Sequence, residues 1–203
     1  SGAQVILVDI NEKKGRKLEK ELGPSSKFFK LDVSSEKNWK DLMIVIGKSY
    51  KHLDILVSNA GISPAPKRIE ELELKEYLKV ININQIGTFL AIKSTIPYLK
   101  KSGKSSIITI SSTAGINGVT GLAPYVSSKF AIRAITKVAS LELGHYGIRV
   151  NSILPGPIDT EMLRDEGDWG IDMRKALSES NPLGRIGRPI DVTELAAFLA
   201  SDV

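Results

Sequence analysis

The sequence predicts an α/β fold, in which one parallel, doubly wound sheet carries helices on both faces. Short apolar runs of strand length alternate with longer segments of helical spacing along the whole chain. Leu53–Ser58, LDILVS, is almost continuously apolar, which is typical of a parallel strand buried on both faces. No internal repeat or low-complexity linker divides the 203 residues, so we expect one domain over residues 1–203.

The first half of the chain predicts three strands separated by two helices. The Gly23-Pro24 pair is a helix stop, and the sequence Asp32-Val33-Ser34 turns the chain into the second helix. In order, the predicted elements are a strand over Gln4–Ile10, a helix over Asn11–Leu22, a strand over Lys27–Leu31, a helix from about Ser35 to Tyr50, and a strand over Leu53–Ser58.

The second half continues the alternation and ends in a long connection before the last helix. In order, we expect a long helix from about Leu74 to Lys100, a strand over Ile107–Ser111, a helix from Pro124 to about Leu143, a strand over Ile148–Leu154, an irregular polar segment over Asp159–Arg188, and a helix from about Ile190 to Ser201.

Composition and charge exclude several classes of function. The net charge of +5 suggests nucleic acid, but the lysines are interleaved with Glu and Asp on amphipathic stretches, which favours solvated helix faces. The absence of cysteine and the presence of only His52 and His145 argue against a catalytic zinc site. The chain contains no apolar run long enough for a membrane span, and we expect a cytoplasmic location.

Three side chains between Ser105 and Lys137 suggest proton-transfer chemistry. Tyr125 and Lys129 are four residues apart in a predicted helix, so both project from the same face. An ammonium about 4 Å from a phenol contributes roughly 4 kcal/mol at an effective dielectric of 20, enough to lower the tyrosine pKa by about three units. Ser112 follows a strand whose carboxyl end faces the expected ligand crevice. On its own, the Tyr-Lys pair is more simply explained as part of an amphipathic helix.

The wider pattern resembles the short-chain dehydrogenase/reductase family. A serine thirteen positions before the tyrosine of YVSSK, with SNAG some fifty residues upstream, matches the family in order and spacing. Ser58 departs from the family's commoner asparagine. The resemblance extends to further motifs across nearly the whole chain: Asp9, Leu31-Asp32-Val33, the NQIG of Asn84–Gly87, and Pro155-Gly156-Pro157-Ile158-Asp159-Thr160. It implies a Rossmann-like fold and a nicotinamide cofactor.

The resemblance also implies a catalytic tetrad. Tyr125 would be the general acid in reduction and the base in oxidation, and Lys129 would lower its pKa and bind the nicotinamide ribose. Ser112 would orient the substrate oxygen, and Asn84 would hold a water in a proton relay. Asn82 is a rival for that last role, and a locally bonded helix asparagine is the simpler alternative.

Asp9 points to NAD as the cofactor, with NADP less favoured. A carboxylate at the end of this strand accepts hydrogen bonds from the adenine ribose hydroxyls and repels the extra phosphate of NADP. The alternative is that Asp9 caps the next helix at Asn11. By resemblance, the other cofactor contacts would be Asp32 and Val33 at the adenine, Asn59, Ala60 and Gly61 at a close backbone turn, and Pro155, Gly156, Ile158 and Thr160 near the nicotinamide.

Residues 159–188 are expected to cover the substrate. Long connections at the carboxyl edge of a sheet commonly form lids, and an apolar lining would come from Met162, Leu163, Trp169 and Met173. Anchoring of a surface loop explains the same residues almost as well. In this family the helices over Leu74–Lys100 and Pro124–Leu143 commonly pair between subunits, so a homodimer or homotetramer is expected.

The sequence therefore predicts an NAD(H)-dependent oxidoreductase that interconverts a secondary alcohol and a ketone. The alternatives are an NADP-dependent 3-oxoacyl-carrier-protein reductase and, from a different class, a non-catalytic cofactor-binding regulator. The first strand ends in an acid with no Gly-rich phosphate loop before it, so we expect a longer parent chain that supplies a first strand and a closing strand. Without that central strand, its two neighbours would lie about 9.6 Å apart, too far to pair.

Overall fold

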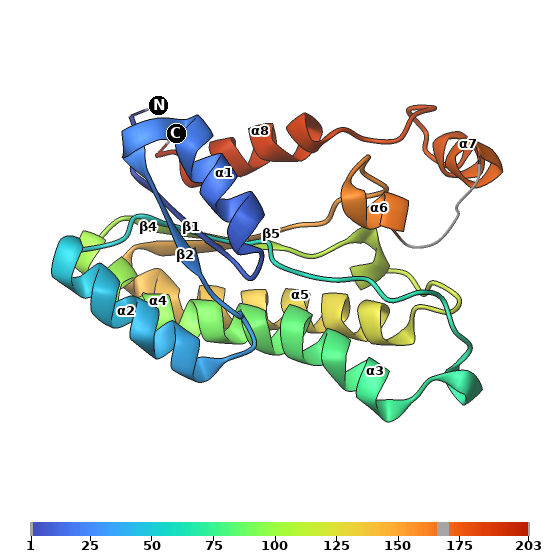
Figure 1. Cartoon of the computed structure of the whole chain (residues 1–203), viewed down its shortest axis with the longest axis horizontal. Coiled ribbons are helices and arrows are strands. Elements are labelled where there is room, and N and C mark those ends of the chain that lie inside the picture. The colour runs from blue at the N-terminus through green and yellow to red at the C-terminus, as the bar shows by residue number, and fades with distance from the viewer. Residues whose placement is uncertain (1, 166–170, 203) are drawn as a thin grey trace.

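The computed structural model describes residues 2–165 and 171–202 and shows parallel strands flanked by helices (Figure 1). Each strand pairing in this part of the chain is parallel. The strands are β1 (Val5–Asp9), β2 (Ser26–Lys30), β3 (Ile55–Ser58), β4 (Ser105–Ile110) and β5 (Ile148–Ile153). The predicted α/β class is confirmed.

The strands form two sheets. Within the described residues, β1 pairs with β2, and β3, β4 and β5 pair in that order, with no ladder between β1 and β3. The outer strand β3 leaves Ile55 42% and Val57 49% exposed, although its sequence is typical of a buried strand. This separation agrees with the expectation that β1 and β3 lie too far apart to pair directly.

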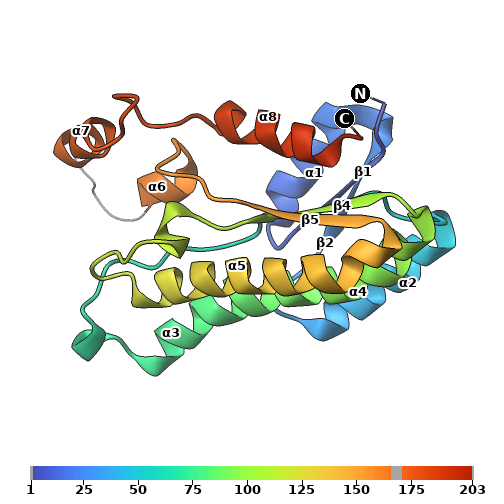
Figure 2. The same ribbon diagram turned by 180° about the vertical axis from the view of Figure 1, so that it is seen from behind.

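Helices cover both sides of the strands. α1 (Glu12–Leu22) and α8 (Pro189–Ala200) lie on one side, while α2 (Glu36–Ser49), α4 (Gly87–Ser102) and α5 (Ala123–Leu143) lie on the other (Figures 1 and 2). None of the helices in the described ranges has the length and apolarity that a membrane span needs. Two clusters form the buried core: Leu31, Trp39, Leu42, Met43, Ile46, Leu90 and Ala91 in one, and Ile92, Leu99, Ile107, Ala139, Leu143, Ile148 and Val150 in the other.

The predicted long helix from Leu74 is interrupted by a π-helical turn. α3 (Leu74–Val80) leads into the π turn Ile81–Ile86, and α4 follows directly. π turns inside helices are rare and frequently occur at functional sites. The regular 3.6-residue spacing of the apolar side chains gives no sign of the change in backbone hydrogen bonding, so the prediction missed it.

The prediction of an irregular segment over Asp159–Arg188 is wrong in two places. α6 (Glu161–Asp165) and α7 (Ile171–Glu179) lie within it. Met, Arg, Lys, Ala and Leu in α7 are good helix formers, but the polar composition masks a helical pattern in so short a segment. The bounds of the other predicted elements agree with the structure to within two residues.

Candidate active site

The carboxyl ends of β4 and β5 bring two loops together at one edge of the sheet. Ser111 N donates to Ile153 O at 2.8 Å and Thr113 N donates to Pro155 O at 2.9 Å. Ser112 lies between these two bonds, and its Oγ accepts the Ala114 N–H at 3.1 Å at the start of a short 3₁₀ turn. Ser112 is thereby fixed, half-buried, at the edge where the ligand crevice of an open α/β sheet lies.

Tyr125 and Lys129 project from the first turns of α5 toward the same edge. Lys129 Nζ lies 5.4 Å from the centre of the Tyr125 ring. The lysine is only 5% exposed, and Nζ donates to Ile110 O, at the end of β4, at 2.9 Å. Burial lowers the pKa of Lys129 from 10.5 to about 8, because desolvation disfavours the charged form.

Asn84 lies in the π turn, and its side chain is completely buried. Its amide pairs with the backbone of Ile62, since Oδ1 accepts the Ile62 N–H at 2.8 Å and Nδ2 donates to Ile62 O at 2.9 Å. These bonds join residues 22 apart, so Asn84 is not bonded locally. Asn82 is exposed. Asn84 thus ties the loop after β3 to the π turn.

Ser128 links Asn84 to Tyr125, a connection that the sequence-based reasoning did not find. Its Oγ accepts from Asn84 Nδ2 at 3.1 Å and donates to Tyr125 O at 2.7 Å. The sequence feature that could have indicated this link is a serine three residues after the tyrosine, because at this spacing on a helix a serine hydroxyl can donate to the backbone carbonyl of the earlier residue. Arg133 was also missed; its Nη1 donates to Gly115 O at 2.6 Å and holds the turn after Ser112 against α5.

The surroundings of Lys129 fit a nicotinamide cofactor on two observations. An ammonium has three N–H bonds, and within the described part of the chain Nζ donates to Ile110 O, which leaves donors for the hydroxyls of a ribose. The backbone of Gly61 lies close to this lysine, since a Cβ there would lie 3.2 Å from Asn84 Oδ1, a tight contact, and 3.8 Å from Lys129 Nζ. The expected turn Asn59-Ala60-Gly61 therefore lies beside Lys129.

The residues expected to bind the adenine half of the cofactor lie at the end of β1 and just after β2, in the other sheet. Asp9 is exposed at the end of β1, and its Oδ1 accepts the Asn11 N–H at 2.7 Å, so it does make the capping contact considered as the alternative. Asp32 Oδ1 accepts from Ser34 N at 2.9 Å and from Ser34 Oγ at 2.7 Å, which shapes the turn after β2. Val33 packs closely on Gly87, where a Cβ would lie 2.9 Å from Val33 Cγ2.

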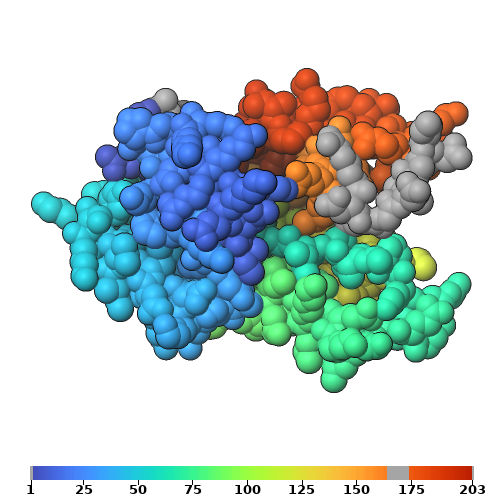
Figure 3. Space-filling model, in the orientation of Figure 1, coloured from blue at the N-terminus to red at the C-terminus, as the bar shows by residue number. Residues whose placement is uncertain are grey.

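The segment Pro155–Thr160 runs from β5 toward α6 beside the Ser112 turn. Pro155, Ile158 and Thr160 are half-buried and Gly156 is exposed. Ion pairing between Lys14 and Glu161 joins α1 to α6, where the N-terminal and C-terminal parts of the chain meet (Figure 3). Among the expected substrate-lining residues, Met162 is 37% exposed and Leu163 is half-buried. Trp169 and the Met173 side chain lie outside the described residues.

Known proteins match the chain along its whole length. The family model described as Enoyl-(Acyl carrier protein) reductase matches residues 1–203. L-fucose dehydrogenase from Bos taurus is 37% identical over 205 residues, which cover 100% of this chain and 75% of that protein. A 3-alpha-(or 20-beta)-hydroxysteroid dehydrogenase from Mycobacterium bovis is 36% identical over 201 residues, covering 99% of this chain and 74% of the relative.

Solved structures agree in fold. The 3-ketoacyl-(acyl-carrier-protein) reductase from Brucella melitensis, complexed with NADH, superimposes with a TM-score of 0.92 at 30% identity, over 99% of this chain and 82% of that one. ElxO with NADP bound has a TM-score of 0.89 at 30% identity, over 98% and 82% of the two chains. With a family model over every residue and relatives above 30% identity, this chain belongs to the short-chain dehydrogenase/reductase family.

Proposed function

We propose that this chain is an NAD(H)-dependent oxidoreductase that interconverts a secondary alcohol and a ketone. The observation that carries the proposal is the meeting of Ser112, Tyr125 and Lys129 at the carboxyl edge of β4 and β5. The buried lysine lies 5.4 Å from the tyrosine ring. Dehydrogenases among the relatives support the reaction class.

In the direction of reduction, each residue has a separate proposed function. The nicotinamide cofactor supplies the hydride when bound. The Ser112 hydroxyl donates a hydrogen bond to the substrate carbonyl oxygen, and the Tyr125 phenol gives that oxygen its proton. The positive charge of Lys129 beside the ring favours loss of the phenol proton. In oxidation the same phenol oxygen accepts the proton from the alcohol.

Replacement of the tyrosine tests this mechanism. Tyr125→Phe removes the proton donor and keeps the ring, so turnover in the full-length protein should fall by roughly 100- to 10,000-fold, the usual contribution of a general acid. NADH oxidation against a panel of ketones measures the loss, and NADH binding should persist in the variant. A turnover of Tyr125→Phe within a few fold of that of the unmodified protein would contradict the proposal. A non-catalytic regulator would bind NADH and show no turnover before any substitution.

The cofactor preference is assigned to NAD because Asp9 is exposed at the end of β1, where its carboxylate would repel a 2′-phosphate. No arginine stands at positions 10 and 11 to pair with that phosphate. Asp9→Ala, with the repulsion removed, should lower the preference for NAD over NADP by about tenfold or more, a loss of roughly 1.4 kcal/mol. Comparison of kcat/KM with NADH and NADPH measures it.

Two of the similar solved structures support a second candidate function. The 3-ketoacyl-(acyl-carrier-protein) reductase among the similar structures and the NADP-bound ElxO match the fold at 30% identity. An NADP-dependent 3-oxoacyl-carrier-protein reductase would show more than tenfold preference for NADPH in the unmodified protein and would turn over 3-oxoacyl thioesters. The preference for NADPH would replace the NAD assignment, and turnover of 3-oxoacyl thioesters would define the substrate class.

The proposal includes a homo-oligomer built on α4 and α5. The two helices lie side by side (Figure 2). Apolar side chains on α4 and α5 remain exposed, among them Phe89 at 44%, Phe130 at 43%, Val138 at 54% and Leu141 at 84%. Exposed apolar groups gathered on neighbouring helices are typical of a subunit interface.

A further inference from the structure

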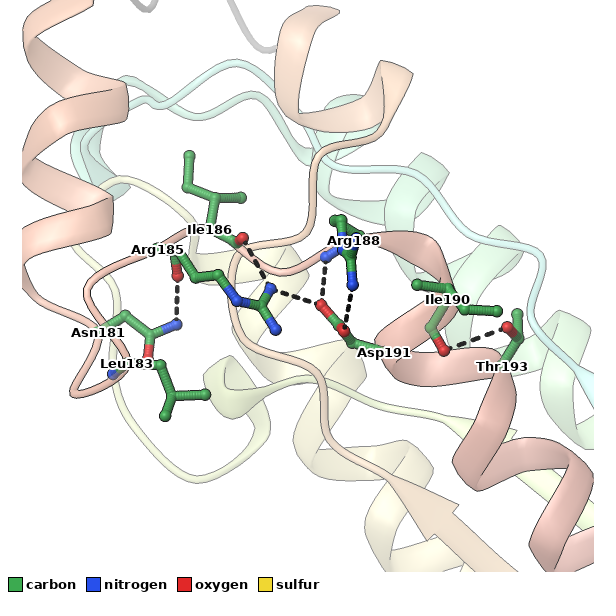
Figure 4. Close-up of polar contacts among 8 residues, drawn as sticks. All are labelled: Asn181, Leu183, Arg185, Ile186, Arg188, Ile190, Asp191 and Thr193. Atoms are coloured by element: carbon green, nitrogen blue, oxygen red, sulfur yellow. Dashed lines mark hydrogen bonds and ion pairs between the residues drawn. The ribbon is translucent and has the colours of Figure 1, made fainter.

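The polar cluster at the start of α8 lies next to the segment expected to bind the nicotinamide. Asp191 Oδ2 accepts from Arg185 Nη1 at 2.6 Å and from the Arg188 backbone N–H at 2.7 Å (Figure 4). The carboxylate therefore binds the chain on both sides of Gly187. Asn181 extends the cluster, because its Nδ2 donates to Arg185 O at 2.8 Å.

Gly187 is held in turn against the segment Pro155–Thr160. Gly187 N donates to Pro157 O at 2.9 Å and Asp159 N donates to Gly187 O at 2.8 Å, so a single glycine bonds the residues on both sides of Ile158. Ile158 forms an isolated parallel bridge with Gly187. A Cβ on Gly187 would lie 2.4 Å from Ile158 Cδ1, so the two segments approach closely here and a larger residue would displace the Ile158 side chain.

The ion pair between Arg185 and Asp191 is thus connected to Ile158 by the backbone hydrogen bonds of Gly187. A second contact supports the same stretch, since Arg174 in α7 pairs with Asp159 at 3.2 Å. Hydrogen bonds from Arg185 and from the Arg188 backbone lower the pKa of Asp191 to about 2, so the carboxylate stays charged at any neutral pH. Exposed ion pairs stabilise a fold only slightly, so the main effect of this one is geometric.

We propose that Asp191 and Arg185 are positioning residues that fix the Pro155–Thr160 segment through Gly187 for binding of the nicotinamide half of the cofactor. The inference rests on the proposed function, because it assigns these two residues to the same cofactor site. Neither residue touches the substrate or the reacting atoms. Loosening of the cluster should weaken NADH binding more than it slows the chemical step.

The test compares Asp191→Ala with a matched control in the full-length protein. Glu76→Ala is the control, because Lys67 and Glu76 form an ion pair of the same length, 2.6 Å. The exposure is also similar: the Lys67 and Glu76 side chains are 39% and 34% exposed, and the Arg185 and Asp191 side chains are 47% and 30% exposed. Asp191→Ala should raise Kd and KM for NADH by roughly 10- to 100-fold, the usual effect of a displaced binding group, with kcat within about threefold. Glu76→Ala should leave Kd unchanged.

Two further variants separate positioning from general destabilisation. Arg185→Lys keeps a cation beside Asp191 and should restore most of the NADH affinity that Arg185→Ala loses. Arg188→Ala keeps the backbone N–H that Asp191 accepts and removes only a side chain 3.7 Å from the carboxylate, so its Kd should match the unmodified protein. Loss of affinity in Arg188→Ala equal to that in Asp191→Ala would overturn the assignment.

Hydrogen exchange provides a readout that needs no activity. In Asp191→Ala the Asp159 and Gly187 amides should exchange at least about tenfold faster, as expected for local opening, while amides of β4 keep their rates. Unchanged rates at both amides, or an NADH Kd within twofold of the unmodified protein, would overturn the positioning function alone. Absence of NADH binding in the unmodified protein would instead overturn the proposed function.

Discussion

Lys129 is a charged side chain in an almost fully buried position, and burial sets its chemistry. With 5% exposure and one backbone acceptor in Ile110 O, its ammonium is poorly solvated. The joint pattern of motifs indicated which lysine would act, since the Tyr125–Lys129 spacing alone is more simply explained by an amphipathic helix. Its burial and its contact with the end of β4 required the packing of α5 on the sheet.

The lowered pKa of Lys129 predicts how stability changes with pH. In the folded chain the pKa is about 8, against 10.5 for an ordinary lysine. Between these values the unfolded chain holds more protons at this site, so the free energy of unfolding rises with pH, by up to about 1.4 kcal/mol per pH unit. Below pH 8 the group is protonated in both states and its burial is fully destabilising.

Urea unfolding without cofactor, from pH 7.5 to pH 10.5, measures this contribution. The free energy of unfolding of the unmodified protein, less that of Lys129→Met, should increase across this range. Lys37→Met, which removes an exposed lysine that pairs with Asp41 on α2, is the control and should show no such increase. A difference that stays constant with pH would contradict the lowered pKa.

At the scale of elements, close contacts decide which residues of a helix touch the strands, which the spacing of apolar residues in the sequence does not show. α1 packs on β2 through Gly15, where a Cβ would lie 1.9 Å from Phe28 Cε2. Phe28 is 1% exposed, so its ring is enclosed by the core. The helix spacing in the sequence predicted α1 to within one residue but did not show that its centre contacts an aromatic ring.

Gly15→Ala should therefore destabilise the fold. Alanine favours a helix interior by about 1 kcal/mol over glycine, but overlap with a buried ring costs roughly 1–3 kcal/mol or more, so the overlap dominates. We expect a net loss of about 1–2 kcal/mol in the free energy of unfolding, measured by urea titration. Gly144→Ala is the control, since no heavy atom lies within 4 Å of a Cβ there. Equal stability of the two variants would show that the contact is not rigid.

At the scale of the whole molecule, large apolar side chains remain exposed on α4 and α5. Leu141 is 84% exposed and Val138 54% exposed on α5. Periodicity predicted both helices but could not separate a side chain facing the sheet from one facing a second subunit. Both environments select the same apolar residues.

Leu141→Glu should shift the full-length protein toward smaller species. A charge in the centre of an apolar interface leaves it unpaired and desolvated, and such substitutions commonly cost several kcal/mol. Analytical ultracentrifugation at micromolar concentration measures the change. Ile44→Glu on α2 is the control, because Ile44 is 59% exposed on a helix outside the proposed interface, so its replacement should leave the assembly unchanged. An unmodified protein that sediments as a monomer would contradict the oligomer.

The sequence by itself determined the order and type of the main elements and the identity of the proposed catalytic side chains. The elements depend on local spacing, and the proposed catalytic side chains were identified by the joint pattern of motifs that resembles the family. Only the tertiary structure decided what depends on contacts between distant segments: the separation of the two sheets, the pairing of Asn84 with Ile62, and the bonds from Gly187 to Pro157 and Asp159. Such bonds form between backbone groups or single side chains, which leave no period in a sequence.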